Sequence, residues 1–182
     1  MLQALAIACD VRDEDDMTGL IGEAVARFGR IDVMVNNAGV GYLMSPILET
    51  DAATWDSVLH VNLRGVFFGI KAAARQMIAQ GDGGRIINIA SQAAKRGFAG
   101  AAAYVSSKHG IVGLTRTAAL EFGGNAITVN SICPNHVTTG LGAWQNEHFS
   151  AEGGDTEDDY MAAMRGRIPL GRPGLVADIA NM

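Results

Sequence analysis

The sequence lacks the long apolar run that a membrane-spanning helix requires. No stretch approaches the roughly 18 apolar residues of such a helix, and the opening segment "MLQALAIACD" has no basic region typical of a signal peptide. Blocks of lysine and arginine are absent as well, and a formal charge of −5 does not suit a nucleic-acid surface. We therefore expect a cytoplasmic protein with no membrane span and no nucleic-acid partner.

Cysteine and proline are scarce. The 182 residues include 2 cysteines and 4 prolines, against 23 glycines. Cys9 and Cys133 both lie in apolar, strand-like runs, which predicts two buried thiols and no disulfide. The 4 histidines show no ligand spacing with one another or with the cysteines, so we expect no metal site. With 48% apolar residues, the chain can bury the core of one domain.

What the sequence does contain is a regular alternation of short apolar runs and longer amphipathic segments. The apolar runs predict four strands, at 4–11, 31–37, 85–91 and 126–134. Helices are predicted between them, over 13–28, from about 51 to 80 with Thr50 or Asp51 as N-cap, and from about 101 to 122. This alternation predicts an α/β fold with a parallel sheet, helices on both faces, and a ligand at the carboxyl ends of the strands.

Residues 141–166 depart from this alternation. They mix aromatic, acidic and glycine residues, and we expect them to form a substrate lid with short helices over a pocket. Trp144 and His148 are candidates for lining that pocket. Met161 and Met164 are expected to pack within the lid.

The main chemical signal is Tyr104 followed by Lys108 within "YVSSK". Residues four apart share a helix face, and an ammonium beside a phenol favours the ionised phenol. A surface pair at a helix start would have the same spacing, so the surrounding residues decide between the two interpretations. Ser91 ends the preceding predicted strand. Asn62 lies in the apolar run "LHVNLRGVFF", where a buried amide needs hydrogen-bond partners.

Taken together, these residues closely resemble the short-chain dehydrogenases/reductases, a family of NAD(P)-dependent oxidoreductases. The matching motifs occur in the family's order and spacing: "CDV" at 9–11, "NNAG" at 36–39, "HVNLRG" at 60–65, "IINIAS" at 86–91, "YVSSK" at 104–108 and "NSICPNHVTT" at 130–139. The resemblance implies a Rossmann-type fold and the interconversion of a small secondary alcohol and a ketone. It implies NAD or NADP as cofactor, with the choice between them open.

The resemblance also implies roles for four residues at the reacting centre. Tyr104 would be the general acid/base, and Lys108 would favour its ionised form and bind the nicotinamide ribose. Ser91 would hold and polarise the substrate carbonyl. Asn62 would hold a water that links Lys108 to solvent in a proton relay.

Five further residues match the family's cofactor-binding positions. Asp10 and Val11 would contact the adenine, and Asn37 would lie beside the adenosine ribose. Val137 and Thr139 would fix the nicotinamide carboxamide and so orient the face that exchanges hydride.

One family motif has no counterpart in these 182 residues, the glycine-rich turn T-G-x-x-x-G-x-G that holds the cofactor pyrophosphate. The resemblance therefore implies a single partial domain over 1–182, truncated at both ends, which lacks the first two strands and the last strand. Strand 4–11 would then have no neighbour, which predicts either marginal stability or re-pairing beside 31–37.

Two other functions and an oligomeric state also have to be considered. The chain could be a catalytically silent fragment or interaction module, or a nucleotide-binding regulator without turnover. The family usually forms homo-oligomers, so the resemblance implies a dimer or tetramer in which helices 51–80 and 101–122 pair across subunits.

Overall fold

The computed structural model describes residues 3–41, 45–137, 139, 147, 150 and 156–182. The chain divides into two units, which we call unit 1 (residues 1–133) and unit 2 (residues 134–182). Unit 1 holds the sheet and the long helices. Unit 2 holds α6 (Glu157–Arg167) and α7 (Val176–Ala180). The single-domain organisation expected from the sequence stays a prediction.

Unit 1 is built on a three-stranded parallel sheet of β1 (Val33–Asn36), β2 (Gly84–Ile89) and β3 (Ile127–Ile132), in the order β1-β2-β3. Each strand overlaps one of the predicted strands, and the parallel α/β fold is confirmed. Asn36 lies opposite Asn88, and Asn88 lies opposite Ser131. The carboxyl ends of the three strands therefore meet at one edge of the sheet.

The helices of unit 1 follow the predicted segments. They are α1 (Glu14–Phe28), α2 (Ala52–Leu59), α3 (Gly65–Gln80) and α4 (Ala102–Phe122), with short turns η2 (Gln92–Ala94) and η3 (Gly123–Asn125). Asp13 caps α1 by accepting two backbone N–H groups, and Asp51 caps α2 by accepting the N–H of Thr54. Between α2 and α3 the helix contains one π-helical turn, η1 (His60–Arg64).

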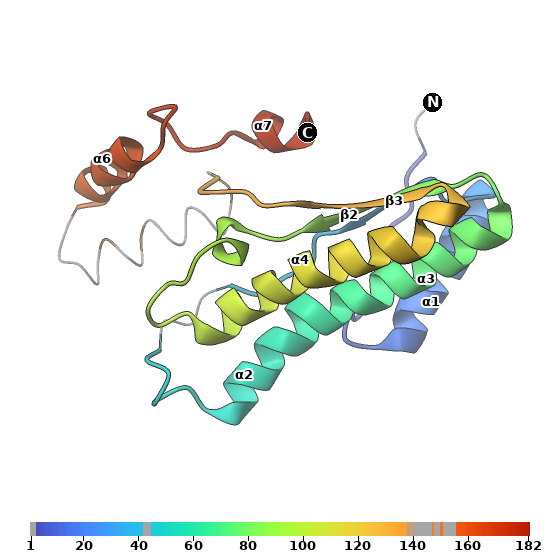
Figure 1. The fold of residues 1–182 in the computed structure, drawn as a ribbon, viewed down its shortest axis with the longest axis horizontal. Coiled ribbons are helices and arrows are strands. Elements are labelled where there is room, and N and C mark those ends of the chain that lie inside the picture. Colours follow the sequence, from blue (N-terminus) through green and yellow to red (C-terminus); the bar gives the residue numbers. More distant parts are fainter. Residues whose placement is uncertain (1–2, 42–44, 138, 140–146, 148–149, 151–155) are drawn as a thin grey trace. The chain divides into compact units, whose positions relative to one another are not determined.

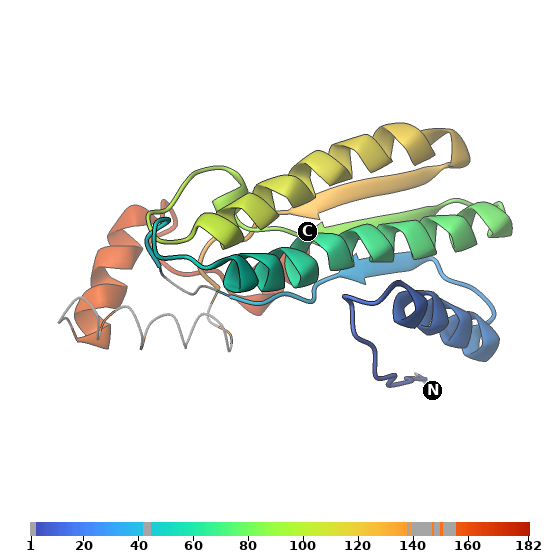
Figure 2. The same cartoon turned by 90° about the horizontal axis from the view of Figure 1, so that it is seen from below.

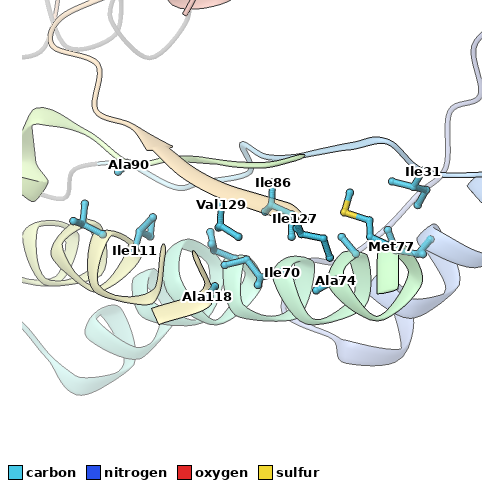
Figure 3. Close-up of a cluster of buried hydrophobic side chains, with 14 of the residues drawn as sticks. Ile31, Ile70, Ala74, Met77, Ile86, Ala90, Ile111, Ala118, Ile127 and Val129 are labelled. Atoms are coloured by element: carbon cyan, nitrogen blue, oxygen red, sulfur yellow. The ribbon is translucent and has the colours of Figure 1, made fainter. Parts of the chain in front are cut away.

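The core of unit 1 lies between the sheet and the helices α3 and α4 (Figure 3). Met77 of α3 and Ile111 of α4 meet Ile86 of β2 and Ile127 of β3, and each of these side chains is at most 1% exposed. Full burial of one such side chain contributes roughly 1.5–3 kcal/mol. Packing of this density holds the carboxyl edge of the sheet and the first turns of α4 in fixed positions.

The sequence predicts helices on both faces of the sheet, but the described helices of unit 1 all lie on one face, as Figures 1 and 2 show from two directions. On this face Ile86 and Val129 are buried, whereas Val33 and Val35 on the opposite face of β1 are 53% and 51% exposed. β1 is an edge strand, since it pairs with β2 alone among the strands of the described sheet.

The strand predicted over 4–11 is wrong, and so is its predicted re-pairing beside 31–37. Residues 3–10 form no strand and are mostly exposed. An apolar run becomes a strand only where a neighbouring strand accepts and donates its backbone hydrogen bonds. Cys9 and Cys133 are free thiols, as predicted, but both are half-buried and not buried.

Candidate functional site

Helix α4 places Tyr104 and Lys108 side by side at the carboxyl edge of the sheet. The Nζ atom of Lys108 lies 5.5 Å from the centre of the Tyr104 ring. Tyr104 is 8% exposed and Lys108 is 5% exposed, so the pair is buried and the surface-pair interpretation is excluded. Lys108 Nζ donates to the carbonyl oxygen of Ile89, the last residue of β2, over 2.9 Å. The helix and the strand end are thereby joined at this pair.

Burial shifts the proton equilibrium of Lys108. Because the ammonium is removed from water, the pKa of Lys108 is lowered to about 8 from 10.5, and the electrostatic interaction with Cys133 acts in the opposite direction. At neutral pH most of the molecules still carry the cation. A buried lysine whose proton equilibrium lies close to neutrality is an arrangement that recurs at functional sites.

Asn62 lies in the π-helical turn η1 and is fully buried. Its Oδ1 accepts the backbone N–H of Val40 over 2.7 Å, and its Nδ2 donates to the Val40 carbonyl over 3.0 Å. A second Nδ2 hydrogen bond goes to Ser107 Oγ over 3.2 Å. The amide therefore joins the loop after β1 to helix α4, and π-helical turns are frequent at functional sites.

Gly39 of this loop lies beside both Asn62 and Lys108. A Cβ atom built at Gly39 would lie 3.3 Å from Asn62 Oδ1 and 3.8 Å from Lys108 Nζ. Any side chain here would occupy the space beside the ammonium. The glycine of "NNAG" thus leaves room next to Lys108, as expected for close backbone approach to a ligand.

Ser91 lies two residues after the end of β2 and is 8% exposed. Its Oγ accepts the backbone N–H of Ala93 over 3.1 Å and so caps the short turn η2. Ala93 belongs to the same buried cluster as Tyr104. The structure therefore brings the turn that begins at Ser91 to the helix that carries Tyr104.

The residues predicted to hold the adenosine end of the cofactor lie on two loops of unit 1. Asp10 is exposed and forms an ion pair with Arg12 of 2.6 Å. The hydrogen bonds from Arg12 lower the pKa of Asp10 to about 2. Val11 packs against the start of α3, where a Cβ at Gly65 would lie 3.0 Å from its side chain. Asn37 is exposed just beyond β1.

Val137 and Thr139 belong to unit 2. Val137 forms a parallel bridge with Gly174, and the backbone N–H of Thr139 donates to the Val137 carbonyl over 2.8 Å. Of the residues predicted to line or pack the lid, Trp144 and His148 lie outside the described residues. Met161 and Met164 lie on α6 and are half-buried.

The sequence reasoning missed a chain of buried polar groups beneath the site. Asn36 Nδ2 donates to Asn88 Oδ1 over 2.8 Å, and Asn88 Nδ2 donates to Thr115 Oγ1 over 3.0 Å. A Cβ at Gly69 would lie 1.9 Å from Asn36 Oδ1, so the amide packs directly on α3. The sequence offered one signal for this chain of polar groups, because Asn36 and Asn88 occupy inward-facing positions of two predicted strands.

In the part of the chain that the structure describes, no helix has the length and apolar character needed to cross a membrane. Nor do three or more histidine, cysteine or acidic side chains gather there as they would around a metal ion.

Comparison with known proteins gives one family. The sequence model for short chain dehydrogenases matches residues 1–149. The 2-dehydro-3-deoxy-D-gluconate 5-dehydrogenase of Escherichia coli K12 is 38% identical over 175 residues, which make up 96% of this chain and 65% of that protein. The sorbitol dehydrogenase of Cereibacter sphaeroides is 36% identical, over 98% of this chain and 70% of that protein. The chain thus spans about two thirds of the length of these relatives.

Solved structures give the same result. A crystal structure of actinorhodin polyketide ketoreductase with NADPH superposes with a TM-score of 0.89 at 37% identity, covering 96% of this chain and 67% of that one. The NAD⁺-bound xylitol dehydrogenase superposes with a TM-score of 0.87 at 32% identity, covering 96% and 69% of the two chains.

Proposed function

Because the chain belongs to the short-chain dehydrogenase family, we propose that it carries the proton-transfer centre of an NAD(P)-dependent oxidoreductase. The reaction is the interconversion of a small secondary alcohol and a ketone. The observation that carries the proposal is the buried pair of Tyr104 and Lys108, with Lys108 Nζ 5.5 Å from the phenol ring.

The cofactor fits the residues that surround this pair. The side-chain-free position at Gly39 leaves space beside Lys108 Nζ, and the ammonium together with the Tyr104 hydroxyl would hold the nicotinamide ribose. Bound NAD(P) supplies or accepts the hydride, and the protein supplies orientation and proton transfer. At the other end, Asp10 and Val11 would hold the adenine, and Asn37 would lie beside its ribose. Val137 and Thr139 would hold the carboxamide.

Tyr104 is the residue that moves a proton. In alcohol oxidation, the phenolate accepts the hydroxyl proton of the substrate. In the reverse direction the phenol returns that proton to the carbonyl oxygen. An ammonium beside the ring favours the negative phenolate over the neutral phenol. Since the pKa of Lys108 is about 8, this cation is present at neutral pH.

Ser91 and Asn62 prepare the site. Ser91 Oγ already accepts the Ala93 N–H, so its own hydroxyl proton can donate to the substrate oxygen and hold it near Tyr104. Both N–H groups of the Asn62 amide are used by Val40 and Ser107, and Oδ1 keeps one lone pair for a water of the proton relay.

The first test is fluorescence titration of the 182-residue chain with NADH and NADPH, followed by turnover of polyols and ketones. We expect saturable binding by the wild-type chain and by Tyr104→Phe. Turnover by the variant should be about 10²–10⁴-fold slower, because it loses the proton-transfer group and keeps the ring. Equal turnover by the two chains would contradict the role of Tyr104. Binding without turnover in the wild-type chain would favour the nucleotide-binding regulator, and no binding by a folded chain would favour the silent fragment.

A further inference from the structure

We infer that Ser107 is a positioning residue, whose hydroxyl fixes the Asn62 amide and, through it, the loop that follows β1. The inference rests on the proposed function, because it concerns the same centre. Ser107 lies between Tyr104 and Lys108 on α4 and is fully buried.

The direction of each hydrogen bond around Ser107 is determined. Its hydroxyl has one proton, which it donates to the Tyr104 carbonyl over 2.7 Å. The oxygen can therefore only accept from Asn62 Nδ2, 3.2 Å away. Asn62 must then present its oxygen to the N–H of Val40, as it does over 2.7 Å. Ser107 thereby favours the same amide orientation that the N–H and carbonyl of Val40 favour, and it fixes that amide to α4.

This orientation controls the loop beside Lys108. Asn62 binds both the N–H and the carbonyl of Val40, and the preceding residue is Gly39, next to the ammonium. If the amide loses its anchor on α4, the loop is held less firmly and water gains access to Lys108 Nζ. The titratable groups that face this atom are Tyr104 on the same helix and Cys133 after β3. Neither group is altered by a change at Ser107.

The chain contains a matched control in the adjacent serine. Ser106 occupies the same helix but is exposed, so Ser106→Ala removes an identical hydroxyl without touching Asn62. Ser107→Ala removes the buried hydroxyl. Ser107→Thr retains a hydroxyl that can donate to the carbonyl one turn earlier in a helix.

The experiment is an NMR titration of the ¹³Cε signals of lysine in the unliganded chain. The sequence contains three lysines, Lys71, Lys95 and Lys108, so the signals can be assigned by single substitution. We expect Ser107→Ala to raise the pKa of Lys108 by about 1, because solvation of the ammonium increases. Ser106→Ala and Ser107→Thr should leave that pKa unchanged.

Two outcomes would overturn the inference. One is a folded Ser107→Ala chain in which the pKa of Lys108 equals the wild-type value. The other is an equal rise in Ser107→Thr, which would assign the effect to packing and not to the hydroxyl. Thermal melts by circular dichroism establish which variants are folded.

The wild-type chain provides a second test that holds even where Ser107→Ala fails to fold. Both Nδ2 protons of Asn62 should exchange with solvent at least tenfold more slowly than those of exposed amides, because both are donated inside the protein. Exchange at the rate of an exposed amide would overturn the inference.

These readouts are independent of cofactor and turnover, so the two proposals can fail separately. A raised pKa of Lys108 in Ser107→Ala, together with no NADH or NADPH binding by the wild-type chain, would retain the role of Ser107 and refute the proposed function. An unchanged pKa of Lys108 in Ser107→Ala, together with cofactor binding and turnover by the wild-type chain, would refute the role of Ser107 and retain the proposed function.

Discussion

Replacing Lys108 with methionine should make the fold more stable at neutral pH. The side chain is 5% exposed, and burial lowers its pKa to about 8 from 10.5. At 1.36 kcal/mol per pKa unit, that difference corresponds to a cost of roughly 3 kcal/mol for keeping the cation inside. Loss of the hydrogen bond to the Ile89 carbonyl offsets about 1 kcal/mol of this. The net gain expected for Lys108→Met is about 2 kcal/mol.

The gain should depend on pH in a defined direction. Below about pH 8 the lysine is protonated in both the folded and the unfolded chain, so the folded state bears the full cost. Between about 8 and 10.5 the folded lysine loses its proton first, and the cost decreases. Above 10.5 the lysine is neutral in both states, so the advantage of methionine disappears.

The assay is urea denaturation of the wild-type chain and Lys108→Met at several pH values from 7 to 10.5. Lys95→Met is the control, because Lys95 is exposed. The difference in free energy of unfolding between Lys108→Met and wild type should shrink as the pH rises, and the control should show no such slope. A difference that stays constant from pH 7 to 10.5 would refute the assignment of this cost to a buried charge.

Three further predictions concern the framework. Gly69→Ala should destabilise the fold by about 3 kcal/mol, because its Cβ would lie 1.9 Å from Asn36 Oδ1. Gly113→Ala, on an open helix surface, should stabilise it by about 0.5–1 kcal/mol, as thermal melts can measure. Asp13→Ala should cost about 1 kcal/mol, since two N–H groups of α1 lose their acceptor. Asp13→Asn keeps an acceptor and should cost less in the same denaturation assay, and equal losses would contradict the capping role.

Much of the fold could be predicted because its signals are local. Apolar runs and helix caps such as Asp51 are read from neighbouring residues, and three of the four predicted strands are confirmed. The juxtaposition of Tyr104 and Lys108 also follows from helix periodicity alone. Their burial does not, and it is burial that lowers the pKa of the lysine.

The parts that could not be predicted depend on contacts between distant segments. Residues 4–11 have the composition of a strand, but a strand needs a partner that composition cannot supply. Asn62, in the π-helical turn, hydrogen-bonds the loop at Val40, 22 residues away in the sequence. Ser107 and Ser106 are identical in the sequence, and only the structure distinguishes the buried serine from the exposed one.

The amide pair of Asn36 and Asn88 has a consequence for how the strands find their alignment. Sliding β1 along β2 by one residue would turn its apolar side chains to the wrong face, but sliding by two residues would not. A two-residue slip would set Asn36 against Ile86 or Ala90 in place of Asn88. Asn36 Nδ2 would then lose its acceptor, and the buried Asn88 Oδ1 would lose its donor. The two asparagines thus favour one strand register among several that the apolar pattern alone would allow.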